Sequence, residues 1–224
     1  ENGADEILYV DAVASLYGRN SLNEHIKKIS KSIFLPLIVT GGIRNMGDIE
    51  TVLKSGADKV GINSAAIKNP NLITEAVNEF GSSTIVVSIE AKKIDNKNYN
   101  AFIDCGRDDS GIDVIDWINI AQDNGAGEIL ITSIDRDGCC SGYENNLLDR
   151  IEKICRIPLI YSGGINSLDN MKKITKQKVD AIAVGSALHY NIHQLIEKNS
   201  TTHYINIPKN LITFNLNDVR DYLV

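Results

Sequence analysis

The feature that most constrains the fold of this 224-residue chain is an internal repeat with a spacing of 122 residues. Residues 2–8 (NGADEIL) recur as residues 124–130 (NGAGEIL), with six identities in seven. At the same spacing, residues 35–69 align without a gap on residues 157–191, and 11 of those 35 pairs are identical. Shared apolar strands and turn glycines would not by themselves keep one constant spacing. We therefore expect two homologous halves that fold alike.

Short apolar runs, rich in Ile and Val and bounded by turn residues, alternate with amphipathic stretches. Their continuous apolar character is typical of strands buried on both faces, as in a parallel sheet. The expected strands are Glu6–Asp11, Leu35–Gly42, Lys59–Asn63, Thr84–Ala91, Glu128–Asp135, Ile157–Gly164 and Ala181–Ser186. Helical periodicity marks Leu22–Ile33, Asn71–Phe80, Leu147–Cys155 and a final helix near Leu216–Leu223. This alternation predicts an α/β fold with right-handed crossovers.

The repeat also indicates how the sheet closes. The run Thr84–Ala91 begins the second half, and its counterpart would lie before residue 1, because 84 is smaller than the spacing of 122. Two halves of four βα units make a (β/α)₈ TIM barrel. We therefore expect residues 1–224 to form one such domain from two duplicated half-barrels, with the first βα unit, about 40 residues, missing from this sequence. A doubly wound open sheet is the alternative.

Composition excludes several classes of protein. The hydrophobic share of 43% is too high for a disordered chain, and a net charge of −6 argues against a nucleic-acid-binding surface. We expect no signal peptide at its start, and no apolar run approaches the ~20 residues that cross a membrane. Four cysteines without a CxxC pair favour a reducing cytoplasm. Scattered histidines and the absence of nucleotide-binding motifs predict neither a metal site nor a cofactor.

Glycines and small polar residues follow the expected strands, at the face where barrels of this kind carry their sites. Backbone amides without side chains can approach a phosphate closely, and a following helix N-terminus favours the negative charge. One cluster is Gly41-Gly42 with Asn63-Ser64, and its copy is Gly163-Gly164 with Gly185-Ser186. A single glycine pair is equally explained by a tight turn. Two copies across one mouth predict a substrate with a phosphate at each end.

Carboxylates form a second group at the same face, because Asp11, Glu90, Asp135 and Asp137 fall at or just beyond strand ends. General acid–base chemistry needs two groups whose pKa values are pushed apart by their surroundings. Glu90 is the strongest candidate, since it places a charge at the end of a buried strand. The alternative interpretation is a salt bridge to a neighbour such as Lys92. Asp and Gly are also ordinary loop formers, which weakens the case for residues 135–138.

Four stretches of sequence resemble one enzyme family closely. They are residues 56–66 (GADKVGINSAA), 80–82 (FGS), 125–130 (GAGEIL) and 132–138 (TSIDRDG). The chain is similar, from residue 1 to about 191, to HisF, the cyclase subunit of imidazole glycerol phosphate synthase. The resemblance implies a duplicated (β/α)₈ barrel and a lyase of histidine biosynthesis.

The same resemblance implies the chemistry. Ammonia from a glutamine amidotransferase partner (HisH-like), bound as a heterodimer, would pass through the barrel. It would close the imidazole ring of a bis-phosphorylated ribulosyl nucleotide, giving imidazole glycerol phosphate and aminoimidazole carboxamide ribotide.

Carried over residue by residue, the resemblance assigns three groups of sites. One substrate phosphate would meet Gly42, Asn63 and Ser64, and the other Gly138, Gly164, Gly185 and Ser186, with Asp11 and Asp137 also binding substrate. An ammonia gate would consist of Glu6, Lys59 and Glu128, which the residues alone would present as a stabilising feature at strand starts. Glu90 takes the position of a catalytic Asp of the family.

Two departures from the family pattern qualify these expectations. Glu90 is one methylene longer than the Asp of the pattern, and a misplacement of about 1 Å can cost ~100-fold in rate. The pattern's other catalytic Asp belongs to the segment expected to be missing. The stretch His193–Thr213 is also polar and longer than the pattern.

Two alternatives to a histidine-pathway cyclase therefore stay open. One is a paralogue that delivers ammonia for surface-sugar amidation, and the other is a non-catalytic scaffold that binds the glutaminase. The strings 63–66 and 134–138 favour these HisF-like readings over a related sugar-isomerising barrel.

Overall fold

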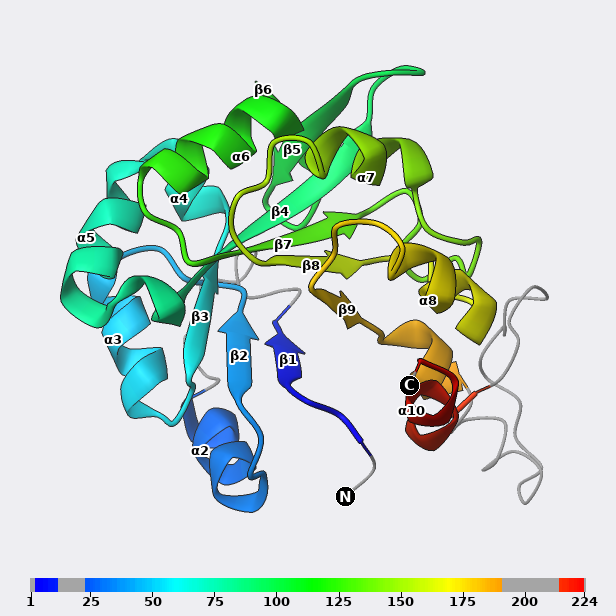
Figure 1. The fold of residues 1–224 in the computed structure, drawn as a ribbon. Coiled ribbons are helices and arrows are strands. Elements are labelled where there is room, and N and C mark those ends of the chain that lie inside the picture. The colour runs from blue at the N-terminus through cyan, green and yellow to red at the C-terminus, as the bar shows by residue number, and fades with distance from the viewer. Residues whose placement is uncertain (1–2, 12–22, 191–213, 224) are drawn as a thin grey trace.

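A computed structural model describes residues 3–11, 23–190 and 214–223 of the chain. Its centre is a curved sheet in which seven strands run parallel in the order β1-β2-β3-β4-β7-β8-β9. Their bounds are β1 Ile7–Val10, β2 Leu37–Thr40, β3 Lys59–Ile62, β4 Ile85–Lys93, β7 Glu128–Ser133, β8 Leu159–Ser162 and β9 Ala181–Ala183. The strands curl into a nearly closed barrel with helices outside it, which confirms the predicted (β/α)₈ class (Figure 1).

The described helices lie between successive strands, as the alternation predicts, except for the last one, which follows β9. They are α2 Asn23–Ser32, α3 Met46–Lys54, α4 Ser64–Lys68, α5 Asn71–Phe80, α6 Val114–Asp123, α7 Asn145–Ile151, α8 Leu168–Ile174 and α10 Leu216–Leu223, with a 3₁₀ turn η1 over Ser82–Thr84. The helices predicted over 71–80 and 216–223 have the observed bounds. The helix predicted over 147–155 ends at Ile151, and turns follow it. None of these described helices combines the length and apolarity that crossing a membrane requires.

The duplication is visible in the hydrogen bonds of the two halves. The register of β1 against β2 is repeated, 122 residues later, by that of β7 against β8. At the start of β2, Leu37 N donates to Asp58 Oδ2 at 2.8 Å. At the start of β8, Leu159 N donates to Asp180 Oδ2 at the same 2.8 Å. The constant spacing in the sequence therefore reflects one structural unit used twice.

An antiparallel hairpin is the main element that the sequence interpretation missed. Strand β4 does not end at Ala91 but continues to Lys93, and it pairs with β5 (Tyr99–Ile103), which pairs in turn with β6 (Asp108–Asp113). The turn before β5 is organised by Asp95 Oδ1, which accepts from the backbone N–H groups two and three residues later. Glu90 consequently lies inside a strand rather than at its end, opposite β5.

Two apolar clusters form the core. The larger one lies between the sheet and the surrounding helices and includes the fully buried Trp117 and Ile118. The smaller one gathers residues of six strands: Leu8, Ile38, Val86, Leu130, Ile160 and Ala183. Because side chains alternate across a strand, this second cluster fills the inside of the barrel. An apolar layer thus separates the two ends of the barrel interior.

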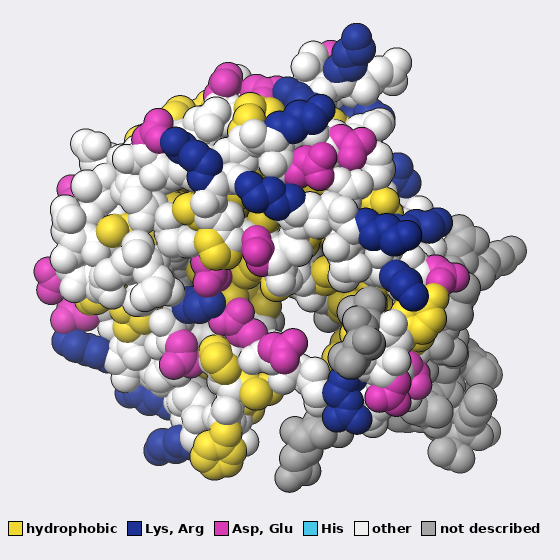
Figure 2. All heavy atoms as spheres, in the orientation of Figure 1, with side chains coloured by type: hydrophobic (Ala, Val, Ile, Leu, Met, Phe, Trp, Pro, Cys, Tyr) yellow, Lys and Arg dark blue, Asp and Glu magenta, His cyan; other side chains and the backbone are white. Residues whose placement is uncertain are grey.

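The barrel has a seam between β1 and β9, which are not hydrogen-bonded to each other in the described residues. Figure 2 shows the surface hollowed at this seam, between the body that carries β1 and the side that carries α10.

Candidate active site

Three charged side chains meet at the N-terminal end of the barrel strands. Lys59 Nζ donates to Glu128 Oε1 at 2.6 Å and forms an ion pair with Glu6 Oε1 at 2.9 Å. Burial disfavours the charged ammonium, but the two carboxylates outweigh it, so the pKa of Lys59 lies above its ordinary value. The three residues assigned to the ammonia gate are therefore in direct contact. Their role as a gate stays a prediction.

Above the apolar layer, hydroxyl-bearing side chains share the inner face of the sheet with Glu90. Glu90 pairs in register with Thr132, and Thr132 pairs with Ser162. Ser88 lies two residues before Glu90 and faces the same side, since successive side chains of a strand alternate. The interior thus changes from charged to apolar to polar along the barrel axis.

The Glu90 carboxylate is held by two donors from other elements. Its Oε2 accepts from Gly106 N at 2.7 Å and from Asn63 Nδ2 at 3.1 Å. Burial raises the pKa of Glu90, and the nearby Asp104 and Asp137 raise it further, against the lowering effect of the two donors. A carboxyl group that binds its proton more tightly than usual is suited to general acid–base work near neutral pH.

The salt bridge considered for Glu90 is not observed. Among the described residues no ion pair joins it to Lys92, whose Nζ lies over the Phe102 ring, 5.0 Å from the centroid. The extended strand explains the difference, because β5 places Phe102 directly opposite Glu90. Among the described residues, the Glu90 carboxylate therefore forms no ion pair that would hold it permanently ionised.

The first of the two predicted phosphate clusters lies against the hairpin turn. Ser64 Oγ accepts from Asp104 N at 2.9 Å, and Asn63 Nδ2 also donates to Phe102 O at 3.2 Å. Gly42 lies two residues beyond Thr40, which pairs with Gly61, and this places Gly42 level with Asn63. The structure thus brings the three predicted residues to one corner of the mouth. It adds Asp104, which the sequence interpretation did not include.

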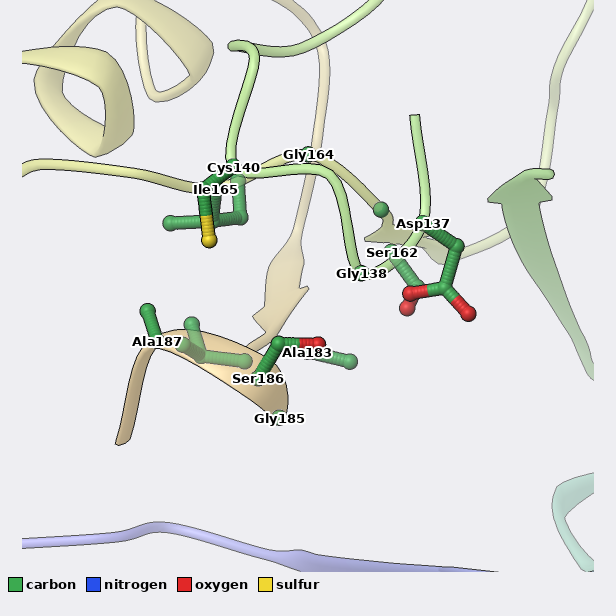
Figure 3. A pocket seen from close by; sticks show the side chains of 12 residues that line it. Asp137, Gly138, Cys140, Ser162, Gly164, Ile165, Ala183, Gly185, Ser186 and Ala187 are labelled. Carbon is green, nitrogen blue, oxygen red and sulfur yellow. The ribbon is translucent and has the colours of Figure 1, made fainter. Parts of the chain in front are cut away.

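The second predicted phosphate cluster forms a single pocket. The four residues predicted for it line the same hollow: Gly138, Gly164, Gly185 and Ser186. Asp137, which was predicted to bind substrate, lines it too. Figure 3 shows them arriving from three places, the loop after β7, the turn after β8 and the segment after β9. Residues 186–190 are helical, so Ser186 stands at the start of a helical segment. Cys140 lines this pocket as well, although a thiol in a loop gave the sequence no phosphate-related signal.

Gly164 shows why this pocket needs glycine. Its φ is +79°, and a Cβ atom there would fall 2.2 Å from Gly142 O. Gly142 N in turn donates to Gly164 O at 2.8 Å. The loop after β7 is therefore in close contact with Gly164, and a side chain at this position would push the loop away from the turn after β8.

The remaining predicted sites are only partly placed. Asp11 follows β1, and its N donates to Thr40 O at 2.9 Å. The residues after it, 12–22, lie outside the described residues, and so does the stretch 193–213 that departs from the family pattern. In the described part of the chain, no three His, Cys, Asp or Glu side chains are grouped so that they could hold a metal.

The chain is similar to known proteins along most of its length. A family profile described as "Histidine biosynthesis protein" matches residues 1–194. The imidazole glycerol phosphate synthase subunit HisF of Legionella pneumophila is 47% identical over 167 residues, which is 75% of this chain and 79% of that protein. The HisF subunit of Helicobacter hepaticus is 43% identical over 190 residues, covering 85% and 75%. The HisF subunit of Dictyoglomus thermophilum is 43% identical over 195 residues, covering 87% and 77%.

These relatives carry the name of one subunit of a synthase, and they align along most of both chains. The match covers the strands of the barrel, the three charged residues at its base and both predicted phosphate clusters. The chain belongs to the histidine biosynthesis protein family, among the HisF subunits of imidazole glycerol phosphate synthase.

Proposed function

We propose that this chain is a cyclase subunit of imidazole glycerol phosphate synthase. It takes ammonia from a glutamine amidotransferase subunit and closes the imidazole ring of a bis-phosphorylated ribulosyl nucleotide. The products are imidazole glycerol phosphate and aminoimidazole carboxamide ribotide. The observation that carries this proposal is Glu90, a carboxyl with a raised pKa that stands between two glycine-rich clusters at one end of the barrel.

The two clusters suit the two ends of such a substrate. The pocket around Gly138, Gly164 and Ser186 offers unhindered backbone and a hydroxyl to one phosphate. Gly42, Asn63 and Ser64 would hold the other phosphate across the mouth. A substrate fixed at both ends would lie over the Glu90 carboxylate, which could then move protons during ring closure.

The barrel interior suits the passage of neutral ammonia. An ammonium ion would have to lose its hydration to cross the layer of Ile38, Val86 and Leu130, and that cost is high for a charge. Ammonia carries no charge and can reach the hydroxyl groups below Glu90. We place the glutaminase partner, as a heterodimer, at the opposite end, around Glu6, Lys59 and Glu128. All four cysteines are free, in keeping with a cytoplasmic enzyme.

Glu90 itself is the observation that favours a second candidate function. Where the family pattern has Asp, this side chain is one methylene longer, so its carboxylate stands farther from the backbone. If that displacement removes cyclisation, the chain would channel ammonia to another enzyme, as in surface-sugar amidation, or would act as a scaffold for the glutaminase. The two donors on Oε2 favour the catalytic reading, because they fix the longer side chain in one place.

The deciding assay supplies the full-length protein with ammonium salt and the ribulosyl nucleotide, so that no glutaminase is needed. We expect imidazole glycerol phosphate to form. Absence of turnover in the parent protein, together with turnover in Glu90→Asp, would reject the cyclase and favour the ammonia-delivery function. Absence of turnover in both, with tight binding of the glutaminase subunit, would favour the scaffold.

A further inference from the structure

One buried carboxylate near the site has no part in the proposed chemistry. Glu144 directly precedes α7, and only 6% of the residue is exposed. Burying a charge is costly unless it is paired and hydrogen-bonded. The residues that compensate the Glu144 charge are therefore fixed in position, and so are the loops to which they belong.

Each side of the Glu144 carboxylate is occupied. Oε1 accepts from Tyr99 Oη at 3.0 Å. Oε2 accepts from Arg136 Nε and Nη2, both at 3.0 Å. The backbone N of Glu144 donates to Tyr161 Oη at 2.9 Å. The four residues, which we name the Glu144 cluster (Tyr99, Arg136, Glu144 and Tyr161), form one connected network.

Both phenols of the Glu144 cluster keep their protons. Burial raises the pKa of Tyr161 to about 12. Burial also raises the pKa of Tyr99, and the adjacent Glu144 carboxylate raises it further. Tyr99 therefore remains a hydrogen-bond donor to Glu144 at any physiological pH.

The members of the cluster come from three elements of the mouth. Tyr99 begins β5, the strand that leads to the turn holding Glu90. Tyr161 lies on β8, which leads to Gly164. Arg136 belongs to the loop after β7 and is followed directly by Asp137 and Gly138. The cluster thus joins the support of Glu90 to the wall of the phosphate pocket.

Arg136 is the contact between the cluster and the pocket. Its Cβ lies 2.9 Å from the position that a Cβ on Gly164 would take. The turn around it is closed by Arg136 N and Asp137 N, which donate to Ser133 O at 3.0 and 2.9 Å. Fixing the Arg136 side chain therefore fixes the turn that presents Gly138 to the pocket.

We propose that Glu144 is a positioning residue for phosphate binding, acting through Arg136 on the loop that carries Asp137 and Gly138. The inference rests on the proposed function only in taking this pocket as the phosphate site. Without the Glu144 charge, the guanidinium loses its anchor, the turn at residues 133–139 loosens, and Gly138 no longer holds its position opposite Ser186.

The test compares two isosteric variants that each neutralise the acid of a carboxylate–arginine pair. Glu144→Gln breaks the cluster, whereas Asp113→Asn weakens the Arg150–Asp113 pair, which lies outside the pocket. The asparagine can still accept the Ile115 N–H that Asp113 caps. Affinity for inorganic phosphate is measured by calorimetric titration, and unfolding temperature is recorded for each variant.

We expect Glu144→Gln to raise the Kd for phosphate about tenfold, the effect of leaving one charged donor without its partner. Asp113→Asn should leave that Kd within about twofold of the parent, even where the two variants lose similar stability. Glu144→Asp keeps the charge and should recover part of the affinity. If Glu144→Gln does not fold, Tyr99→Phe removes one donor and should still raise the Kd measurably.

Three results would overturn the inference, and they can be told apart. If the parent binds phosphate and the Glu144→Gln variant binds it equally well, the cluster is only a stabilising feature. If the parent binds no phosphate, the pocket assignment fails, and the proposed function loses one of its two phosphate sites as well. A Kd that rises equally in Asp113→Asn would assign the effect to general stability and would also reject a positioning role.

Discussion

The two halves of the barrel have the same backbone conformation after their strands, but they place different side chains there. Gly41 and its counterpart Gly163 have φ values of +101° and +107°. A Cβ on Gly41 would fall 2.3 Å from Asp11 O, and a Cβ on Gly163 would fall 2.7 Å from Ser133 O, which is again the counterpart. The position after the next strand differs, since the first half has Asn63 and the second has Gly185.

That one difference separates two kinds of site. Asn63 donates to Glu90, so the first-half cluster is tied to the acid–base group and closed by the hairpin. A Cβ on Gly185 would meet nothing within 4 Å, so the second-half cluster is an open pocket wall. Duplication therefore repeats the backbone of both clusters, and a difference at a single position ties only the first-half cluster to Glu90.

The largest effect on activity is expected at Glu90, whose carboxylate is bonded to the first-half cluster through Asn63. Glu90→Gln should reduce ammonium-dependent cyclisation by about 10²- to 10⁴-fold, because glutamine cannot exchange a proton. Binding of the phosphorylated nucleotide should change little, since both phosphate clusters are intact. Steady-state kinetics and calorimetry measure the two separately. Loss of binding instead of turnover would show that Glu90 holds substrate and does not transfer protons.

The same variant gives a pH test with a definite sign. The folded state raises the pKa of Glu90 above 4.5, so the folded protein binds this proton more tightly than the unfolded chain does. Its contribution to stability is therefore fully present at low pH and falls as pH rises through the folded pKa. Thermal melts from about pH 4 to about pH 8 should show Glu90→Gln gaining stability relative to the parent. A relative loss over that range would contradict the raised pKa.

Within the open pocket, two glycines should respond very differently to a methyl group. Gly164→Ala should lower the free energy of unfolding by about 2–4 kcal/mol, because the Cβ would collide with the backbone at a left-handed φ. Gly185→Ala, with open space around it, should cost less than about 1 kcal/mol. Denaturant titration gives both values. Equal costs would mean that the loop after β7 does not press on Gly164.

At the base of the barrel the halves differ again, since Glu6 and Glu128 are counterparts but only the first half contributes Lys59. Lys59→Met should lower the free energy of unfolding by about 1–3 kcal/mol, because it leaves two partly buried carboxylates without their cation. Glutamine-dependent activity should fall more than ammonium-dependent activity. Lys54→Met, in an exposed pair with Glu50, is the control and should cost under about 0.5 kcal/mol. Equal loss of both activities would make the three charges structural only.

The smallest effects should be equal in the two halves. Asp58→Ala and Asp180→Ala each remove one acceptor from the first backbone N–H of a strand. Each should cost about 1 kcal/mol, and the two should agree within about 0.5 kcal/mol. Chemical denaturation of the single variants measures this. A large difference would show that the two copies of this hydrogen bond no longer contribute equally to the free energy of unfolding.

Much of the fold could be predicted because parallel strands buried on both faces leave long apolar runs, and a duplication repeats them. The hairpin escaped for the opposite reason. Strand β6 is polar and none of its residues is buried, so its sequence resembles a loop. Strand β5 is short, and it is buried only because it pairs with the end of β4. The last residues of β4 are in turn extended because they pair with β5, so neither feature has a signal of its own in the sequence.

The candidate site divides along the same line. That the residues of each glycine cluster lie together was predictable, because glycines after strands have a local signal. Glu144 was not, because nothing near it in sequence shows that a glutamate before a helix will be buried. Its environment is set by Tyr99, 45 residues away. The partner of Glu90 was missed similarly, since Gly106 lies in the unpredicted hairpin.

The hairpin turn beside Glu90 has a consequence for how the mouth keeps its shape. Asp104 and Cys105 have φ values of +51° and +63°, a conformation that costs a residue with a side chain roughly 1 kcal/mol or more. The turn is therefore unfavourable by itself and is kept in place from outside, by the Ser64 hydroxyl and the Lys68 ammonium. A ligand that competes for the Ser64 hydroxyl would remove one of these contacts from the same turn whose Gly106 N–H donates to Glu90.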